Sequence, residues 1–212
     1  DENIIASLNW SYGKPNDLVS EGSAALWDNS AARNPMSLTI TDGDGATGTD
    51  DIFKTAGGDQ DGRTFFLDLG SRVPADSLVF FPRQEGTYAN GKPFSDDFVR
   101  KHRISMNDGL TYSNEQPLFT LLRDIPVNPN SIFSMKFPQQ FIRFVQLRVG
   151  SRNPFEIAEI ELYGNGFVPR ATYRSDIINL GDVSNYGTIS WAQRALELVG
   201  EELVDLGDSE QT

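Results

Sequence analysis

Six aspartates crowd into one short, glycine-rich stretch, and carboxylates at this density favour a hard cation. They are Asp42, Asp44, Asp50, Asp51, Asp59 and Asp61, with Lys54 as the single base among them. Ca²⁺ takes about six to eight oxygen ligands from flexible loops and relieves repulsion between unpaired carboxylates. The stretch is not an EF-hand, because that spacing counted from Asp42 puts Phe53 at the position of the bidentate glutamate. The alternative is a solvated turn whose aspartates cap backbone N–H groups.

A second group of side chains has the chemistry of sugar recognition. Sugar binding takes an apolar surface for the C–H face of the ring and polar groups that hydrogen-bond its hydroxyls. The segments FPRQEGTYANG and SRNPFE supply such groups in Arg83, Tyr88, Arg152, Asn153 and Phe155. Structural alternatives stay open, with Phe155 in the core, Asn153 stabilising the turn before Pro154, and Arg83 paired with a carboxylate such as Glu85.

The sequence lacks the patterns of common catalytic sites. Without cysteine, disulfides, zinc–thiolate sites, iron–sulfur clusters and cysteine nucleophiles are excluded. Ser-His-Asp chemistry would need the one histidine, His102, yet there is no G-x-S-x-G elbow. The glycine-rich GDGATG at 43–48 is acidic, which does not suit phosphate, and no carboxylate pair has glycosidase character. We therefore expect no enzymatic activity.

Charge and composition limit the partners. The 212 residues include 30 acidic and 18 basic ones, giving a formal charge of −12 that repels nucleic acid and anionic lipid. A content of 38% apolar and 23% charged residues is typical of a globular protein, and no apolar run is long enough to span a membrane. The Asp-Glu-Asn start lacks signal-peptide regions, but a removed signal would leave the same start.

Short alternating segments separated by Gly, Pro, Asn or Asp predict an all-β protein. The expected strands cover 36–40, 64–70, 77–82, 98–106, 118–122, 131–137, 141–149 and 156–164. No convincing long amphipathic helix lies between them. This pattern is typical of an antiparallel β-sandwich or jelly roll.

The two ends of the chain differ from this centre. Residues 1–35 carry isolated aromatics with weak periodicity, so we expect a segment that wraps the sandwich. Residues 167–212 are acidic and read as an extension, with strands at 173–181 and 187–191. A short amphipathic helix is expected over 192–206, although Gly200 weakens it by roughly 1 kcal/mol relative to alanine. The central domain is expected over 36–166.

Several sequence segments of the central domain occur in the order found in a known family. FLDLG (66–70), VFFPRQEGTYANGKPFSDDFVRKHRISMNDG (79–109) and FIRFVQLRVGSRNPFEIAEIELYG (141–164) resemble the factor V/VIII type C (discoidin) family. That family has the galactose-binding-like fold and includes many bacterial carbohydrate-binding modules. The resemblance implies a jelly-roll sandwich whose loops at one end hold a ligand, usually with a structural calcium.

The resemblance also assigns residues. It implies calcium ligands from the Asp42–Asp51 loop, completed by Glu159 or alternatively Glu161 of the closing strand. Phe53 stands where the family usually has a tryptophan. Ligand contacts are implied in the 151–156 loop, and some sugar-binding relatives use a histidine near His102; a hydrogen-bonded surface histidine is the alternative there.

These features predict a non-catalytic, calcium-stabilised module that binds glycan or another surface ligand. It would belong to a secreted or surface-anchored protein, extracellular once a signal peptide is removed. The alternative is a structural subunit of an extracellular filament, layer or shell, in which residues 167–212 contact a neighbouring subunit or domain.

Overall fold

The computed structural model describes residues 3–29, 38–47, 59–166, 194–199 and 202–208. The chain divides into two compact units, Asp1–Arg170 and Ala171–Thr212. The strands of the first unit are β1 (Trp10–Tyr12), β2 (Ala24–Asp28), β3 (Thr64–Phe81), β4 (His102–Asn107), β5 (Tyr112–Ser113), β6 (Gln116–Pro117), β7 (Thr120–Ile125), β8 (Phe133–Val149) and β9 (Glu159–Tyr163). Its 3₁₀ turns are η1 (Ile5–Ser7), η2 (Leu38–Thr41) and η3 (Phe94–Asp96). Among the described residues, no helix has the length and apolar character needed to cross a bilayer.

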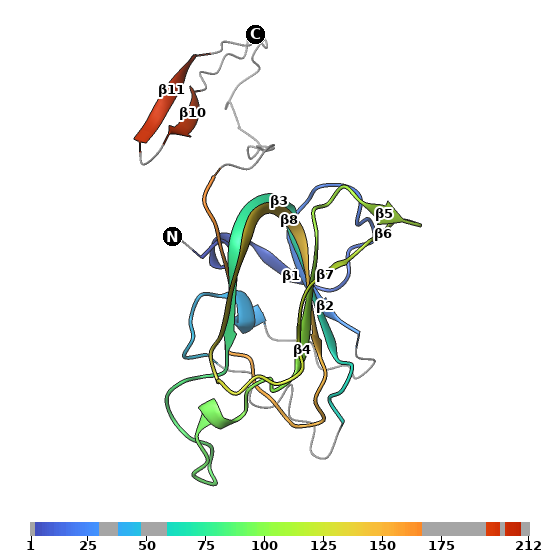
Figure 1. The fold of residues 1–212 in the computed structure, drawn as a ribbon, viewed down its shortest axis with the longest axis vertical. Coiled ribbons are helices and arrows are strands. Elements are labelled where there is room, and N and C mark those ends of the chain that lie inside the picture. Colours follow the sequence, from blue (N-terminus) through green and yellow to red (C-terminus); the bar gives the residue numbers. More distant parts are fainter. Residues whose placement is uncertain (1–2, 30–37, 48–58, 167–193, 200–201, 209–212) are drawn as a thin grey trace, which may run out of the picture. The chain divides into compact units, whose positions relative to one another are not determined.

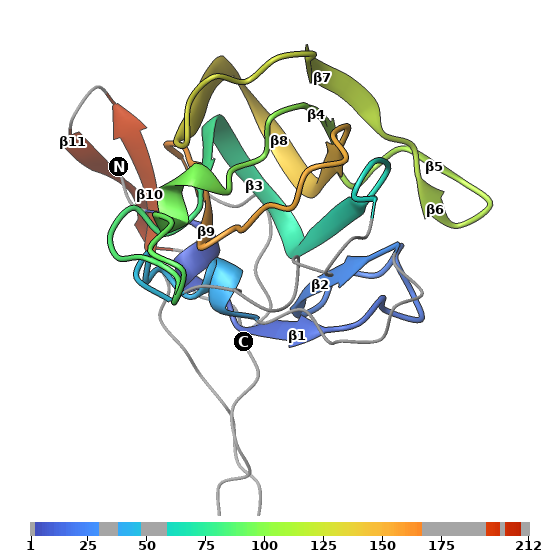
Figure 2. The ribbon, with the colours of Figure 1, turned by 90° about the horizontal axis from the view of Figure 1, so that it is seen from below.

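Two long strands, β3 and β8, run through both layers of a β-sandwich. Their pairing is antiparallel from Thr64↔Arg148 to Phe80↔Phe133. The first half of β3 lies between β2 and β8, and the second half of β8 continues to β4 and β7, which gives the order β1-β2-β3-β8-β4-β7. The second half of β3 lies instead between β8 and β9. Figure 1 shows β3 and β8 arching over together, and Figure 2 shows the larger layer from β2 across to β7.

The bend in β3 depends on a glycine. The β3–β8 register shifts between Asp68 and Val73. Gly70, within this shift, has φ +78°, and a Cβ built there would lie 2.1 Å from the carbonyl oxygen of Gly22. The Gly22 N–H donates to the Gly70 carbonyl at 2.9 Å. Only glycine tolerates both this backbone conformation and this close approach.

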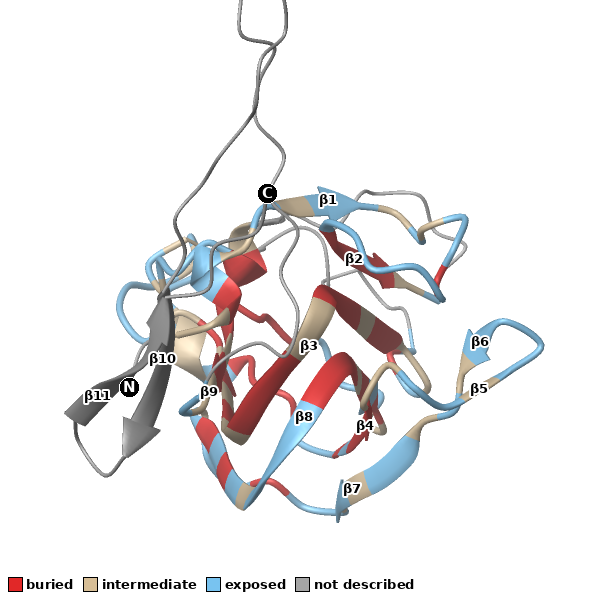
Figure 3. Ribbon diagram, turned by 90° about the horizontal axis from the view of Figure 1, so that it is seen from above, coloured by how far each residue is buried: buried red, intermediate tan, exposed pale blue. Residues whose placement is uncertain are grey.

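The core lies between the two layers and draws alternate side chains from each. Phe65 and Leu67 from the first half of β3 are buried, as are Leu78 and Phe80 from the second half. Figure 3 shows buried segments alternating with less buried ones along β3 and β8. Burying one such apolar side chain contributes about 1.5 to 3 kcal/mol. The all-β sandwich predicted from the sequence is confirmed.

A buried ion pair that the sequence did not reveal links β3 and β8 within the larger layer. Arg143 of β8 and Asp68 of β3 are both 2% exposed. The Nε and Nη2 atoms of Arg143 lie 2.9 and 3.1 Å from the two carboxylate oxygens of Asp68. Nη2 also donates to the Ser20 carbonyl at 2.7 Å, which ties the β1–β2 loop to the sheet.

Several expected boundaries differ from the structure. The expected strands at 64–70 and 77–82 merge into β3, and those at 131–137 and 141–149 merge into β8. The intervening residues stay extended because register shifts, rather than turns, absorb the bend.

Three other strand predictions shift in position. Strands expected at 98–106, 118–122 and 156–164 occupy His102–Asn107, Thr120–Ile125 and Glu159–Tyr163. Phe98 and Val99 before β4, and Ile157 and Ala158 before β9, are buried in connecting loops, so their apolar character did not mark a strand.

Two predictions for the first 40 residues are wrong. The strand expected over 36–40 is not formed, because Leu38–Thr41 is a 3₁₀ turn in which Ile40 is fully buried. The N-terminal segment does not merely wrap the sandwich, since β2 pairs with β3 inside the larger layer. Leu26 and its neighbours in β2 are buried, so this strand is part of the core. The isolated aromatic residues of the segment did not show the alternation that would have predicted a strand.

The helix predicted over 192–206 is also wrong. Residues Arg194–Val199 (β10) and Glu202–Asp208 (β11) form an antiparallel hairpin in which Leu198 is opposite Leu203. Apolar residues in short runs fit both helical and alternating patterns, and a glycine within the sequence of the expected helix disfavours it. The strands expected at 173–181 and 187–191 lie outside the described residues.

Candidate functional site

Two segments distant in sequence meet around the buried carboxylate of Glu156. Glu156 is fully buried. The Arg83 guanidinium donates to both of its oxygens, with Nε–Oε1 at 2.9 Å and Nη2–Oε2 at 2.8 Å. The Arg83 backbone N–H donates to Oε1 at 3.0 Å, and the Tyr88 hydroxyl donates to Oε2 at 3.1 Å. The charge of Glu156 is therefore balanced by a bidentate ion pair with further hydrogen bonds.

Arg83 and Tyr88, both predicted ligand contacts, are engaged within the protein. The Arg83 guanidinium carbon lies 3.5 Å from the centre of the Phe94 ring, and the Tyr88 ring meets Phe94 edge-on at 4.5 Å. Burial and the nearby charge of Glu156 raise the pKa of the Tyr88 hydroxyl, which stays a hydrogen-bond donor. The alternative of a carboxylate partner for Arg83 is correct in kind, but the partner is Glu156 and not Glu85.

The 151–156 loop presents two polar side chains to solvent from a fixed base. Phe155 is fully buried and meets the Phe65 ring edge-on at 6.0 Å, so the core alternative holds and a direct ligand contact is excluded. The Glu156 N–H donates to the Asp97 carbonyl at 2.7 Å. Arg152, with 82% of its side chain exposed, has Nε 3.1 Å from an Asp59 oxygen. Asn153 is exposed beside it.

The predicted ligand contact at His102 is wrong, because the side chain is fully buried. Its ring lies edge-on to Phe80 at 5.0 Å and to Phe133 at 4.4 Å. Neither ring nitrogen has a hydrogen-bond partner in the part of the chain that the structure describes. Burial lowers the pKa of His102 to about 4, so the ring is neutral at neutral pH. Alternation with Ile104 and Met106 on β4 was the sequence signal for this inward position.

A second buried carboxylate, that of Glu159, lies next to the aspartate loop. Glu159 is 1% exposed, and its Oε2 accepts the Gly43 N–H at 3.0 Å. Its Oε1 has no hydrogen-bond partner among the described residues. Burial first, and then the charge of Asp42, raises the pKa of Glu159 to about 8. A buried carboxyl group in this position requires either a proton or a cation.

The other predicted metal ligands are exposed, half-buried or outside the described residues. Asp42 and Asp44 are exposed and accept the backbone N–H groups of Asp44 at 2.8 Å and Ala46 at 2.9 Å, as in a capped turn. Glu161 is half-buried, and Asp50 and Asp51 lie outside the described residues. Within the described ranges, no group of three or more His, Asp or Glu residues is placed to hold a metal. Among the described members of the predicted ligand set, one oxygen has an environment that fits a cation, namely Glu159 Oε1.

Residues that the sequence reasoning missed hold the loop end together. Glu156 and Phe94 were not singled out, yet Glu156 receives the donors of Arg83 and Tyr88 and Phe94 packs against both side chains. The sequence gave no sign of this role for Glu156, because glutamates are rarely fully buried unless they are paired.

Comparisons with known proteins give structural likenesses only. No family model matches the chain, and a search of curated proteins gives no match. Among solved structures, a family 32 carbohydrate-binding module of Clostridium perfringens NanJ in complex with galactose has 18% identity, covers 66% of this chain and 92% of its own, and gives a TM-score of 0.47.

Two further structures are similar at the same level. Chitosan-binding module 2 of a chitosanase/glucanase from Paenibacillus sp. IK-5, in complex with chitotriose, has 15% identity, covers 70% of this chain and 100% of its own, and gives a TM-score of 0.46. The lectin domain of lectinolysin, complexed with Lewis B antigen, has 15% identity, covers 73% of this chain and 100% of its own, and gives a TM-score of 0.43.

Proposed function

We propose that this chain is a non-catalytic, calcium-stabilised module that binds glycan or a similar surface ligand, as part of a secreted or cell-surface protein. The observation that carries the proposal is the exposed pair Arg152 and Asn153 on a loop anchored by two buried neighbours. Phe155 and Glu156 fix the base of this loop through core packing and through the ion pair with Arg83. The backbone next to the two polar side chains is therefore fixed before a ligand arrives, which lowers the entropy lost on binding.

The chemistry of this pair fits hydroxyl groups. A guanidinium offers several donors in a fixed plane, and an amide offers both donors and an acceptor. Asp59 contacts the Arg152 Nε, and most of the Arg152 side chain stays exposed to solvent. The net charge of −12 disfavours strongly anionic ligands, so neutral sugars are the preferred class.

Calcium is proposed as a structural ion next to Glu159. The Oε1 of this buried carboxylate has no partner among the described residues, and together with the nearby charge of Asp42 this supports a cation there. In this proposal Glu159 supplies a carboxylate, Asp42 and Asp44 supply loop oxygens, and Asp50 and Asp51 complete the set, with Glu161 as the alternative to Glu159. The ion would link the aspartate loop to β9 and neutralise the repelling carboxylates.

The glycan proposal is tested by calorimetric titration of the whole chain, with calcium present. Galactose and chitotriose are suitable first probes, followed by a glycan array. The double variant Arg152→Ala, Asn153→Ala should lose at least about tenfold in affinity, since each lost polar contact costs on the order of 1 kcal/mol. Arg103→Ala is the matched control, because Arg103 is an exposed arginine paired with Asp124 on another strand. Folded protein that binds no sugar on the array would refute the proposal.

A second candidate function is assembly through residues 167–212. The observation that favours it is that Ala171–Thr212 forms a compact unit of its own, with the β10–β11 hairpin. Light scattering on the chain with and without residues 167–212 distinguishes this candidate. An oligomer that becomes monomeric on truncation supports assembly, and two monomeric forms rule out assembly through this segment.

A further inference from the structure

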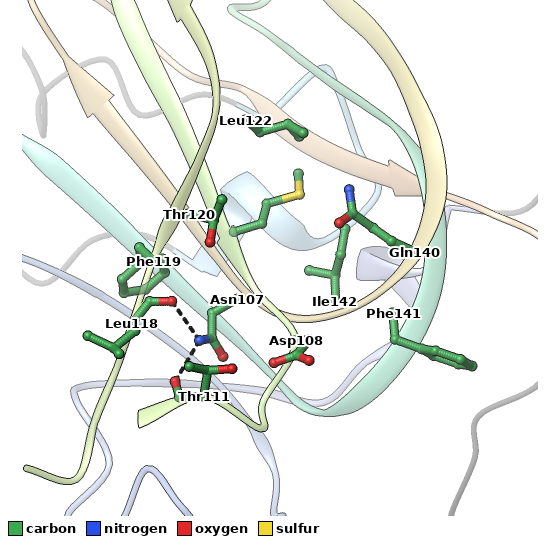
Figure 4. A pocket seen from close by; sticks show the side chains of 11 residues that line it. Asn107, Asp108, Thr111, Leu118, Phe119, Thr120, Leu122, Gln140, Phe141 and Ile142 are labelled. Carbon is green, nitrogen blue, oxygen red and sulfur yellow. Dashed lines mark hydrogen bonds between the residues drawn. The ribbon is translucent and has the colours of Figure 1, made fainter. Parts of the chain in front are cut away.

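A cavity with no role in the loop site or the aspartate loop opens between β4, β7 and the bend of β8 (Figure 4). Its volume is about 450 Å³, within the range of about 300 to 1,000 Å³ typical of small-molecule sites. Its lining includes none of Arg152, Asn153, Glu156 or Glu159. The cavity is therefore a separate feature of the sandwich.

The floor of this cavity is apolar. Met106 of β4 and Ile142 of β8 are buried members of the main core, and Leu122 of β7 packs against the same cluster. A floor of this kind removes apolar C–H surface from water but offers no hydrogen bonds. It would favour a ligand with at least one apolar face.

The rim, in contrast, carries unused polar capacity. Thr120 lies on the β7 side and Gln140 on the β8 side in Figure 4, and both are exposed. Neither side chain makes a hydrogen bond within the described part of the chain. One carboxylate oxygen of Asp108 accepts the Leu110 N–H at 2.9 Å, and no described residue donates to the other oxygen. The cavity thus presents a hydroxyl, an amide and a carboxylate above an apolar floor.

The wall next to this rim is fixed by Asn107. Its amide nitrogen donates to the carbonyls of Thr111 and Leu118, each at 2.8 Å, and its Oδ1 accepts the Gly109 N–H at 2.7 Å (Figure 4). Both N–H donors of the Asn107 amide are used within the protein, and they hold the two ends of the β5–β6 hairpin against β4. The cavity is consequently pre-formed, which limits the ordering cost of binding.

We propose that this cavity binds one uncharged pyranose-sized ring, as a second site independent of the 151–156 loop. The ring would direct hydroxyls to Thr120, Gln140 and Asp108 and place a C–H face on the floor. Among the lining residues none is basic, and Asp108 is the one charged group, so an anionic ring is disfavoured. The nearby Arg72 is not a lining residue, since its guanidinium donates to the Asp108 carbonyl at 2.8 Å and lies over the Phe141 ring. Two separate sites would give the module bivalent contact with one glycan surface, where linked contacts raise overall affinity.

The test is nuclear magnetic resonance of the whole ¹⁵N-labelled chain titrated with three probes. These are methyl β-glucoside, methyl β-glucuronide as the anionic match, and cyclohexanol as the apolar match. We expect saturable shifts of the backbone amides of Thr120, Gln140 and Asp108 with the glucoside, at a dissociation constant of about 1 to 50 mM. The glucuronide should bind at least about fivefold more weakly because of Asp108.

Two variants locate the site and one serves as control. Gln140→Ala should weaken the glucoside shifts at least about threefold, and Thr120→Trp should block them by filling the mouth. Gln139→Ala is the matched control, since the Gln139 amide instead donates to the Asn165 carbonyl. Arg152→Ala should leave the cavity shifts unchanged, so failure of the loop site is distinguished from failure of this one.

Three results would overturn the proposal. The first is the absence of saturable shifts at the cavity with the glucoside. The second is cyclohexanol binding as tightly as the glucoside, which would indicate a merely apolar cleft. The third is glucoside shifts that persist unchanged in both Gln140→Ala and Thr120→Trp, which would place binding elsewhere.

Discussion

Two buried glutamates three positions apart have opposite surroundings. Glu156 accepts two hydrogen bonds from the Arg83 guanidinium, one from the Arg83 backbone and one from Tyr88. Glu159 accepts one backbone hydrogen bond, keeps one oxygen without a partner among the described residues, and faces Asp42. The first carboxylate has its counterion within the protein, whereas the described residues provide none for the second.

The difference separates a carboxylate that supports the structure from a carboxylate that needs a proton or a cation. A buried carboxylate with its own guanidinium fixes the loops that contain it and has little capacity for a ligand. A buried carboxylate without one stays uncharged or recruits a cation, so its state depends on solution conditions. Arg83 and Tyr88 therefore serve the scaffold, while Glu159 is the group through which calcium would act.

The largest expected effect comes from removing the counterion of Glu156. Arg83→Ala should lower the free energy of unfolding by about 3 to 5 kcal/mol, because it leaves a buried charge unpaired. Chemical denaturation measures this loss. Arg103→Ala, which removes an exposed ion pair with Asp124, should cost no more than about 1 kcal/mol. Equal losses in the two variants would contradict the difference between buried and exposed pairs.

The pH dependence of the unfolding free energy extends the comparison to a third buried ionisable group, His102. Its pKa is about 4 in the folded chain against an ordinary 6.5, so the unfolded chain binds more protons between these values. Stability from this group is complete above pH 6.5 and decreases by up to about 3 kcal/mol as the pH falls toward 4. Denaturation at several pH values should show this slope.

The variant His102→Leu isolates the histidine contribution from that of the carboxylates. The difference in unfolding free energy between the natural chain and this variant should change with pH in the same window. A difference that stays constant from pH 6.5 to 4 would show that His102 is not neutral and buried in solution.

Calcium should act through Glu159 and not through Glu156. Saturating calcium should raise the free energy of unfolding by about 2 to 3 kcal/mol at roughly a hundredfold excess over its dissociation constant. Glu159→Gln should abolish this gain, because the amide removes the carboxylate charge while keeping the shape. Thermal unfolding with calcium or EDTA measures the shift. Glu85→Gln, at an exposed glutamate, is the control, and an unchanged melting temperature in EDTA for the natural chain would remove the metal proposal.

The smallest effect concerns the last hydrogen bond to Glu156. Tyr88→Phe should cost about 1 kcal/mol of unfolding free energy, since one donor to a buried carboxylate is lost. Tyr163→Phe removes a hydroxyl whose pKa the nearby, half-buried Glu161 helps to raise, and it should cost less. Denaturation of both variants ranks the two hydroxyls, and a larger loss at Tyr163 would contradict the assignment of Glu156 as the structural anchor.

The fold class was readable from the sequence because alternation and turn residues report local strand geometry. Phe65 and Leu67, for example, alternate with half-buried Phe66 as expected of a strand with one face in the core. The merging of four expected strands into β3 and β8 was not readable. A register shift near Gly70 leaves the chain extended, whereas the pattern of Gly and Pro at this point also fits a turn.

The candidate site was predicted only in part, for a physical reason. Arg152 and Asn153 are at the surface as expected, because polar residues beside Pro154 favour a loop. The burial of His102, and the pairing of Arg83 with Glu156, depend on contacts between distant segments. One sequence cannot show which of several carboxylates an arginine meets, so Glu156 was missed and Glu85 was considered in its place.

The continuity of β3 and β8 has a consequence for how the sandwich responds to strain. In a sandwich made of separate strands, one sheet can peel from the other by breaking side-chain contacts alone. Here the same two strands belong to both layers. Separating the layers would therefore also strain the backbone hydrogen bonds between β3 and β8 where both strands bend. Amide exchange in the two layers should therefore follow a single opening event, and tension applied to one layer would be shared by the other.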